Sequence, residues 1–170
     1  GVRAMAKRTV FATVGTTQFD VLMSTLLSNE LLDALATQGY DELILQIGRG
    51  SEPVLPTSPP LEISWYRFKP SLEEDMRNAT LIISHAGAGS ILEGMRIGAL
   101  MVVVVNDALM HNHQQELAGE LHNRHHLIST VPGHLVAVLR ELGERPPVLE
   151  PMPAADPTAF PRFLAAELGL

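Results

Sequence analysis

Hydrophobic residues in this chain gather in short blocks separated by polar and glycine-containing stretches. Six blocks are only four to six residues long and rich in β-branched residues, which is typical of strands buried on both faces. These blocks are residues 9–14, 43–47, 63–68, 80–84, 100–105 and 127–130. Their length and composition predict six strands of a parallel sheet.

Longer stretches with helical spacing of apolar residues lie between the predicted strands. The predicted helices cover residues 21–38, with a break at Ser28, a segment that opens at residues 70–74, and residues 90–97, 112–123 and 135–142. Ser71 and Glu74 have the spacing of a capping box at the start of one of them. Alternation of strands and helices favours a doubly wound, Rossmann-like α/β fold with right-handed crossovers.

Prolines and glycines divide the rest of the chain. Residues 48–60 contain two glycines and four prolines, which predicts a long exposed loop. Residues 143–157 contain five prolines and read as an extended strap, and residues 158–170 contain a last helix with an apolar stripe that must bury against this domain or a partner. Residues 9–142 form the predicted domain, and residues 1–8 are interpreted as an expression tag and start segment.

Composition narrows the class of protein. The chain has 170 residues, a length expected of about one domain. Its formal net charge of −7 argues against a nucleic-acid partner. The absence of cysteine excludes disulfides and thiolate metal sites, and the longest wholly apolar run, residues 99–105, is far below the roughly 20 residues that span a bilayer.

Candidate chemistry gathers in the loops that follow the predicted strands, where open parallel sheets bind their ligands. The loop of residues 85–90 after the fourth strand begins with His85 and contains Gly87 and Gly89. The glycines allow close approach of a ligand, and the helix start behind them would offer free amides to a phosphate. The alternative is a tight turn between a strand and a helix.

Two further groups suit the sugars of a nucleotide ligand. Glu93 lies off the predicted core face of its helix, where its carboxylate would accept hydrogen bonds from a ribose diol; with Ser90 it also has capping-box spacing, which is the structural alternative. Gln114 and Gln115 carry amides that both donate and accept, which suits sugar hydroxyls, or they belong to an ordinary polar first turn.

The loops after the first and third strands complete the candidate site. Gly15, Thr16 and Thr17 suit an anion or form a turn with a threonine cap, and Phe68 with Lys69 borders a planar base unless Phe68 is core. The seven histidines have no carboxylate at convincing ligand spacing, so no metal site is predicted. A convincing Ser-His-Asp set is also missing.

Four segments, which follow one another in the same order as in a known family, are similar to that family. Residues 11–17, 45–50, 83–93 and 105–115 closely resemble the small donor-binding subunits of the eukaryotic two-subunit UDP-N-acetylglucosamine transferases of asparagine-linked glycosylation, in glycosyltransferase family 28. The similarity covers about residues 9–142. It implies the C-terminal, donor-binding half of a GT-B glycosyltransferase.

The resemblance also implies roles for individual residues. Thr16 and Thr17, with Gly15, lie near the diphosphate; Phe68 and Lys69 border the uracil. Glu93 takes the ribose hydroxyls. The phosphates are held by His85, Gly87, Ala88, Gly89 and Ser90, and the N-acetylglucosamine lies near Asn106, Asn112, Gln114 and Gln115. His85 is the implied catalytic group, stabilising the leaving group without a metal or cofactor.

The implied reaction moves N-acetylglucosamine from UDP to dolichyl-diphosphate-linked N-acetylglucosamine, inverting the anomeric centre to a β1,4 link. The implied partner is a membrane-anchored, acceptor-binding subunit, docked through residues 158–168 and expected to supply the general base. The implied location is the cytosol and the cytosolic face of the endoplasmic reticulum.

Two other functions stay open from the residues alone. Gly87 and Gly89 open a helix and Asp107 follows twenty residues later, as in a dinucleotide-dependent oxidoreductase. Against this, Leu92 occupies the third fingerprint position, and the motif follows the fourth strand rather than the first. The second alternative is a non-catalytic nucleotide-binding interaction module on the same fold.

Overall fold

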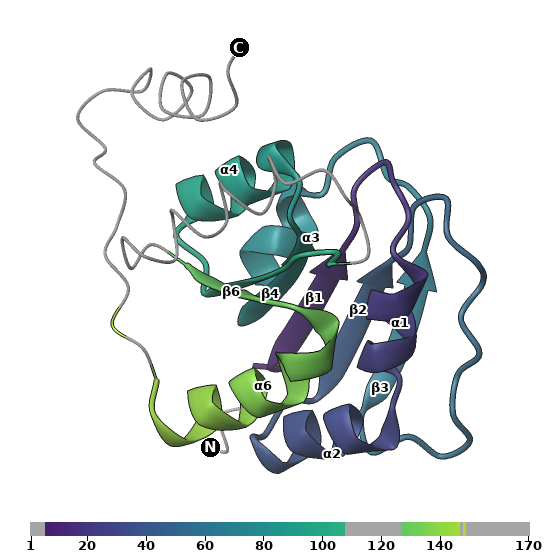
Figure 1. Cartoon of the computed structure of the whole chain (residues 1–170), viewed down its shortest axis with the longest axis vertical. Helices are drawn as coiled ribbons and strands as arrows, with labels where there is room; N and C mark the ends of the chain where they lie inside the picture. Colours follow the sequence, from purple (N-terminus) through teal and green to yellow (C-terminus); the bar gives the residue numbers. More distant parts are fainter. Residues whose placement is uncertain (1–5, 108–126, 147, 149–170) are drawn as a thin grey trace.

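The core of the molecule is one parallel sheet, seen in a computed structural model that describes residues 6–107, 127–146 and 148. Six strands are hydrogen-bonded in the order β3-β2-β1-β4-β5-β6, and every neighbouring pair is parallel. The order reverses direction between β1 and β4 (Figure 1). The predicted doubly wound α/β fold is therefore confirmed, with its topological switch point at the carboxyl ends of β1 and β4.

The elements follow the alternation expected from the sequence. The strands are β1 (Thr9–Thr13), β2 (Glu42–Gln46), β3 (Glu62–Tyr66), β4 (Leu81–His85), β5 (Met101–Val104) and β6 (Ile128–Thr130). The helices are α1 (Asp20–Leu26), α2 (Asn29–Thr37), α3 (Glu73–Asn78), α4 (Ala88–Ile97) and α6 (Leu135–Glu144), with a 3₁₀ turn, η1 (Pro132–His134), before α6. The predicted helices 112–123 and 158–168 lie outside the described residues.

Helices cover both faces of the sheet. Because side chains alternate across a strand, Val10 and Ala12 of β1 pack into one core cluster and Phe11 packs into the other. The first cluster includes buried leucines of α1, α2 and α6, whereas the second includes Met76 of α3 and Ile91 of α4. Thus α1, α2 and α6 lie on one face and α3 and α4 on the other (Figure 1).

The loop after β2 turns back sharply over the end of β1. Gly48 has a φ of +58°, and a Cβ built on it would lie 2.1 Å from the carbonyl oxygen of Thr17. Arg67 holds this turn by donating to the carbonyls of Gly48 at 3.1 Å and Gly50 at 2.7 Å. Only glycine fits at position 48, and the turn keeps the loops after β1, β2 and β3 together.

Neither capping box expected from the sequence forms. Helix α3 begins at Glu73, and the Ser71 hydroxyl accepts from the amide of Glu73 at 3.2 Å rather than from Glu74. Helix α4 begins at Ala88, so Ser90 already lies inside the helix and no side chain caps it. The helix is two residues longer at its start than expected, because the glycine-containing loop enters it directly, with Gly87 as the residue before it.

The break expected at Ser28 within residues 21–38 is confirmed, because the Ser28 hydroxyl accepts from the amide of Leu31 and starts α2 anew. One other helix boundary differs from the sequence pattern. Helix α6 runs to Glu144, two residues past the predicted end, so residues 143 and 144 are helical rather than part of the proline-rich strap.

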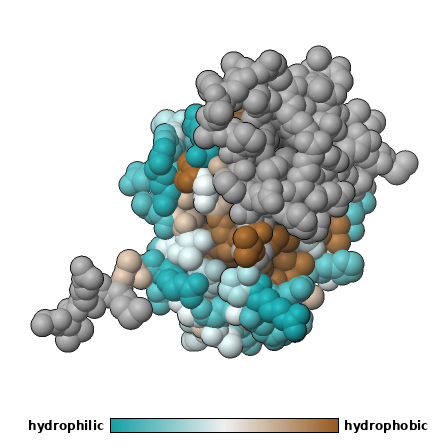
Figure 2. Space-filling model, turned by 90° about the vertical axis from the view of Figure 1, so that its left-hand side faces the viewer, coloured by the Kyte–Doolittle hydropathy of each residue, from teal (hydrophilic) through white to brown (hydrophobic). Residues whose placement is uncertain are grey.

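One side of the molecule carries a compact hydrophobic area. Figure 2 views the side on which α4 and β6 lie in Figure 1, and hydrophobic residues gather in the middle of it between hydrophilic areas. The three residues of β6, which ends the described sheet, are all half-buried. Among the described helices, none has the length and apolar character needed to cross a membrane.

Candidate functional site

A buried glutamine organises the carboxyl ends of the first three strands. Gln46, the last residue of β2, is 1% exposed. Its Oε1 accepts hydrogen bonds from the Thr13 hydroxyl and from the amides of Val14 and Gly15, the latter at 2.8 Å. Its Nε2 donates to the carbonyls of Gly15 and Arg67, both at 2.7 Å. One side chain therefore fixes the ends of β1 and β3 relative to each other.

Gln46 was not among the residues predicted for the site. The signal in the sequence is a side-chain amide inside the otherwise apolar block 43–47, because a polar side chain is buried there only with hydrogen-bond partners. Those partners come mostly from the backbone of distant loops, and the sequence does not identify them.

A cleft of about 300 Å³ lies beside Gln46 at this edge of the sheet. Its lining residues are Gly15, Thr16, Gln46, Phe68, Lys69, Pro70, Ser71, Leu72 and Glu93. The structure thus brings together five of the predicted site residues, from the loops after β1 and β3 and from α4. Phe68 is 53% exposed, so it is not a core residue and its ring is available to a planar ligand.

Lys69 is held at the rim of the cleft by α3. Its Nζ lies 3.0 Å from Asp75 Oδ2 and 4.3 Å from the centre of the Tyr66 ring. The Tyr66 hydroxyl donates to the same carboxylate oxygen of Asp75. Burial, followed by the hydrogen bond to Asp75, raises the pKa of Tyr66 well above its ordinary value, so its proton stays in place. These contacts fix the start of the segment that borders the cleft.

The start of α4 is a helix N-terminus without a side-chain cap. Gly87 precedes the helix, and the first turn contains no acidic residue. By contrast, α1 begins with Asp20 and α3 with three acidic residues. Gly89 is exposed, and a Cβ there would meet nothing within 4 Å. Of these three helix starts at the carboxyl edge, α4 is the one suited to an anion.

His85 lies between two glycine-containing loops at the end of β4. A Cβ on Gly15 would lie 3.1 Å from His85 Nε2, and one on Gly87 would lie 2.2 Å from its Cε1. The Ser90 hydroxyl is 3.4 Å from Nε2. Burial lowers the pKa of His85 from 6.5 to about 4, so the imidazole is neutral at neutral pH. A neutral ring can donate one N–H to a ligand oxygen without carrying a charge of its own.

The remaining predicted residues fall into two groups. Thr17 is exposed next to Thr16, its carbonyl accepts from the Arg49 amide at 3.0 Å, and Asn106 lies half-buried after the end of β5. Asn112, Gln114 and Gln115 lie outside the described residues. In the part of the chain that the structure describes, no group of three or more acidic or histidine side chains is placed to hold a metal ion.

Known proteins are similar to this chain in both sequence and fold. Relatives in several species carry the name UDP-N-acetylglucosamine transferase subunit ALG13. The Mus musculus protein is 42% identical over 88% of this chain, and the Homo sapiens protein is 45% identical over 79% of it. The chain spans only 13% and 12% of these mammalian relatives' length. A Kluyveromyces lactis relative is 31% identical over 79% of this chain and 84% of its own length.

Solved structures agree with the sequence comparison. An NMR solution structure of ALG13 matches with a TM-score of 0.71 and 26% identity, over 96% of this chain and 98% of its own. MurG of Acinetobacter baumannii matches in fold with a TM-score of 0.68 and 19% identity, over 99% of this chain and 51% of its own.

The family assignment rests on most of the chain. Residues 9–167 match the glycosyltransferase family 28 C-terminal domain. The match includes β1, the loop after β4 and α4, which carry the candidate site. This protein is therefore a member of the glycosyltransferase family 28 C-terminal domain family.

Proposed function

We propose that the chain is the donor-binding subunit of an N-acetylglucosaminyltransferase that uses UDP-N-acetylglucosamine. The observation that carries the proposal is the uncapped N-terminus of α4, which opens at the carboxyl edge beside a cleft lined by Phe68 and Glu93. A helix N-terminus suits a diphosphate, an exposed aromatic ring suits a base, and a carboxylate suits the ribose diol. The ALG13 name of the relatives supports the same donor.

In this proposal different residues contact different parts of the donor. Phe68 and the backbone near Lys69 border the uracil, and Glu93 accepts from the ribose hydroxyls. The amides of residues 88–90, with Gly15, Thr16, Thr17 and neutral His85, surround the diphosphate. Asn106, Asn112, Gln114 and Gln115 face the N-acetylglucosamine.

The chemical step breaks the bond between the sugar's anomeric carbon and the UDP oxygen, and forms a bond from the acceptor hydroxyl oxygen to the opposite face of that carbon. Negative charge then develops on the leaving diphosphate. Fixed amide dipoles at the start of α4 and an N–H of His85 stabilise that charge without reorganising, in place of a metal ion. The acceptor's proton passes to a general base that we assign to the partner subunit.

The proposed acceptor is dolichyl-diphosphate-linked N-acetylglucosamine, giving a β1,4 link. We propose that a membrane-anchored subunit binds this lipid and recruits the chain through residues 158–168 to the cytosolic face of the endoplasmic reticulum. The relatives' name identifies them as subunits, which supports a partner.

Calorimetric titration tests the donor site directly. The chain should bind UDP-N-acetylglucosamine and UDP, with or without EDTA, and should not bind NAD. The Glu93→Gln variant should lose about tenfold in affinity for UDP, the size of a charge-assisted hydrogen bond, but little for 2′,3′-dideoxy-UDP, which lacks the diol. Equal losses of affinity for both ligands would contradict the proposed contact between Glu93 and the ribose hydroxyls.

Reconstitution tests the subunit role. Transfer to the lipid acceptor should be low for the chain alone and should rise when the membrane subunit is added. Robust transfer by the single chain would contradict the need for a partner. Donor binding with no transfer in the reconstituted complex would favour the non-catalytic module instead.

The oxidoreductase alternative fits this structure poorly. In that fold the dinucleotide phosphates lie at the helix after β1, but here α1 starts with Asp20, whose carboxylate accepts from the amide of Ser51 at 3.1 Å and from its hydroxyl at 2.9 Å. The glycine-containing loop follows β4 instead. NAD binding by the titrated chain would revive this alternative.

A further inference from the structure

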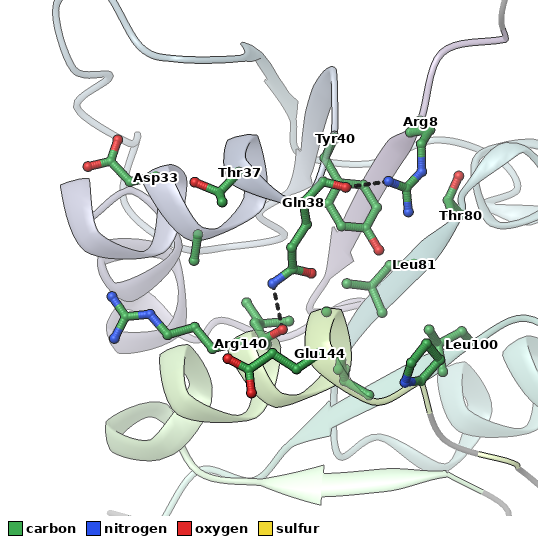
Figure 3. Close-up of a pocket in the computed structure, with 15 residues that line it drawn as sticks. Arg8, Asp33, Thr37, Gln38, Tyr40, Thr80, Leu81, Leu100, Arg140 and Glu144 are labelled. Atoms are coloured by element: carbon green, nitrogen blue, oxygen red, sulfur yellow. Dashed lines mark hydrogen bonds between the residues drawn. The ribbon is translucent and has the colours of Figure 1, made fainter.

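A second and larger cavity lies at the opposite edge of the sheet from the candidate site. It has a volume of about 620 Å³, in the range of pockets that hold drug-sized groups. It is enclosed by α2, α6 and the starts of β4 and β5 (Figure 3). The side chain of Gln38 joins the two helices here by donating to the carbonyl of Leu139 at 2.7 Å.

The inner surface of this cavity is mainly apolar. Leu81 and Leu139 are buried beneath it, and Leu100 and Leu142 are only half-buried at its walls. Tyr40 is 8% exposed, and Figure 3 shows its hydroxyl pointing into the cavity towards Leu81. No described residue forms a hydrogen bond with that hydroxyl. The floor of the cavity therefore offers an occupant apolar contacts and the hydroxyl of Tyr40, and other polar side chains stand around it.

The part of the cavity formed by the ends of α2 and α6 offers negative charge to an occupant. Helices α2 and α6 both end at the cavity, at Thr37 and Glu144, so their negative dipole ends are directed to it. Asp33 and Glu144 line it without an ion-pair partner among the described residues. The two lining arginines are already engaged: Arg140 with Glu30 at 3.3 Å, and Arg8 with the Gln38 carbonyl and the Tyr40 ring.

The sequence that follows the cavity has the complementary character. Pro146 lines the cavity itself, and the chain continues from there into the proline-rich residues 147–157. The next segment, residues 158–168, contains Phe160, Phe163, Leu164 and Leu168 together with Arg162, the only basic residue after position 146. A proline-rich linker extends by about 3.1 Å per residue, so this one is long enough to turn back to the cavity.

We infer that residues 158–168 dock intramolecularly into the cavity between α2 and α6, with the aromatic and leucine side chains against Leu100 and Leu142 and Arg162 near Glu144. A short tether raises the local concentration of the segment to the millimolar range, so a modest apolar contact is enough to populate the docked state. The inference does not depend on the proposed glycosyl transfer. If the same segment also recruits a partner subunit, partner binding is an exchange in which the segment leaves its own domain.

Paramagnetic relaxation in the full chain tests this placement. The chain has no cysteine, so a single Glu141→Cys substitution, at an exposed residue of α6 that does not itself line the cavity, carries a spin label at one site. The label should broaden the amide signals of residues 158–168. The matched control is Glu74→Cys, an exposed helical residue on the other face of the sheet, whose label should leave those signals sharp.

A mixing experiment separates this occupant from a second copy of the chain. In this experiment, protein that carries the spin label but no ¹⁵N is mixed with ¹⁵N protein that carries no spin label. Intramolecular docking is supported if the signals broaden only when the spin label and ¹⁵N are on the same molecule, and if that broadening does not depend on concentration. Broadening across molecules overturns it in favour of a dimer, and sharp segment signals in every sample overturn docking altogether.

Charge reversal tests the predicted polar contact. Glu144→Lys should reduce the broadening by up to about fivefold, the size expected of an exposed ion pair, and adding Arg162→Glu should restore it. Glu144 is exposed at the end of α6, so the substitution is compatible with the fold. Loss without restoration by the double variant would overturn the pairing of Arg162 with Glu144.

Discussion

The two edges of the sheet present opposite ends of its helices. At the carboxyl edge, α4 opens with free amides and no acidic residue in its first turn, beside a cleft organised by Gln46. At the amino edge, α2 and α6 end around a larger cavity with an apolar floor, two acidic side chains and two arginines that have contacts of their own. One edge therefore suits an anion and the other suits an apolar segment with a cation.

The difference shows how one parallel sheet separates two tasks. All strands of such a sheet run in one direction and the helices that connect them run back in the opposite direction, so helix starts collect at the carboxyl edge and helix ends at the amino edge. Binding at one edge need not disturb the other, because their polar networks share no side chain. Variants at each edge should therefore have separable effects on stability and on donor binding.

The largest effect is expected from Gln46→Leu at the carboxyl edge. The substitution keeps roughly the volume but leaves the carbonyl of Gly15 and the hydroxyl of Thr13 without their partner, and it removes one of the two hydrogen bonds of the Gly15 amide and of the Arg67 carbonyl. We expect the free energy of unfolding to fall by about 3 kcal/mol, measured by urea denaturation, and UDP binding to be lost. A stable variant with unchanged affinity would contradict the organising role of Gln46.

The second effect is a pH dependence from His85. Its pKa is about 4 in the fold and 6.5 in the unfolded chain, so the unfolded state binds the proton more readily between those values. The stability due to neutral His85 is complete above pH 6.5 and is lost as pH falls towards 4, by up to about 3 kcal/mol.

Replacing His85 with Asn, which does not titrate, should remove this part of the pH dependence in urea denaturation from pH 7.5 to 4.5. Above pH 7 the free energies of unfolding of the two proteins should change with pH in the same way. An unchanged slope below pH 6 in the variant would assign the dependence to other groups.

A third variant separates stability from binding at α4. Gly89→Asp places a carboxylate in the first turn of α4, where a Cβ meets nothing within 4 Å. The helix dipole should then stabilise the fold by about 0.5 kcal/mol, while the same charge repels a diphosphate and weakens UDP binding about tenfold. Gly89→Asn is the uncharged control, and equal affinities in the two variants would argue against phosphate at this helix.

The smallest effect is expected at the amino edge. Gln38→Leu removes the hydrogen bond from α2 to the carbonyl of Leu139 on α6, which should cost about 1 kcal/mol of unfolding free energy. Affinity for UDP, measured by calorimetry, should not change because Gln38 does not line the candidate cleft at the carboxyl edge. A parallel loss of affinity would show that the two edges are coupled.

Sequence reasoning predicted the sheet because its signal is local. Each described strand was visible as a short apolar block, and the parallel arrangement followed from the alternation with helices. The loop of residues 85–90 was also predicted as a site feature, since its glycines and its position before a helix are sequence properties. The structure adds that Gly15 and Gly87 enclose His85, a contact between loops far apart in the chain.

Prediction from sequence failed where one segment fits two local patterns, or where the hydrogen-bond partners are backbone groups far away in the sequence. Ser90 and Glu93 have capping-box spacing, but α4 starts two residues earlier, so the same side chains face His85 and the cleft instead. Gln46 was missed because its value comes from the backbone of residues 13–15 and 67, which sequence spacing does not reveal. Tertiary partners decided both cases.

The assembly of the cleft from loops after β1 and β3 and from α4 has a consequence for the lifetime of the protein. No fragment that ends before α4 holds all of its lining groups, so a ligand in the cleft binds only the folded chain. At a concentration one hundred times its dissociation constant, such a ligand adds about 2.7 kcal/mol to stability. Under the proposed function, resistance to proteolysis would then rise and fall with the supply of nucleotide sugar.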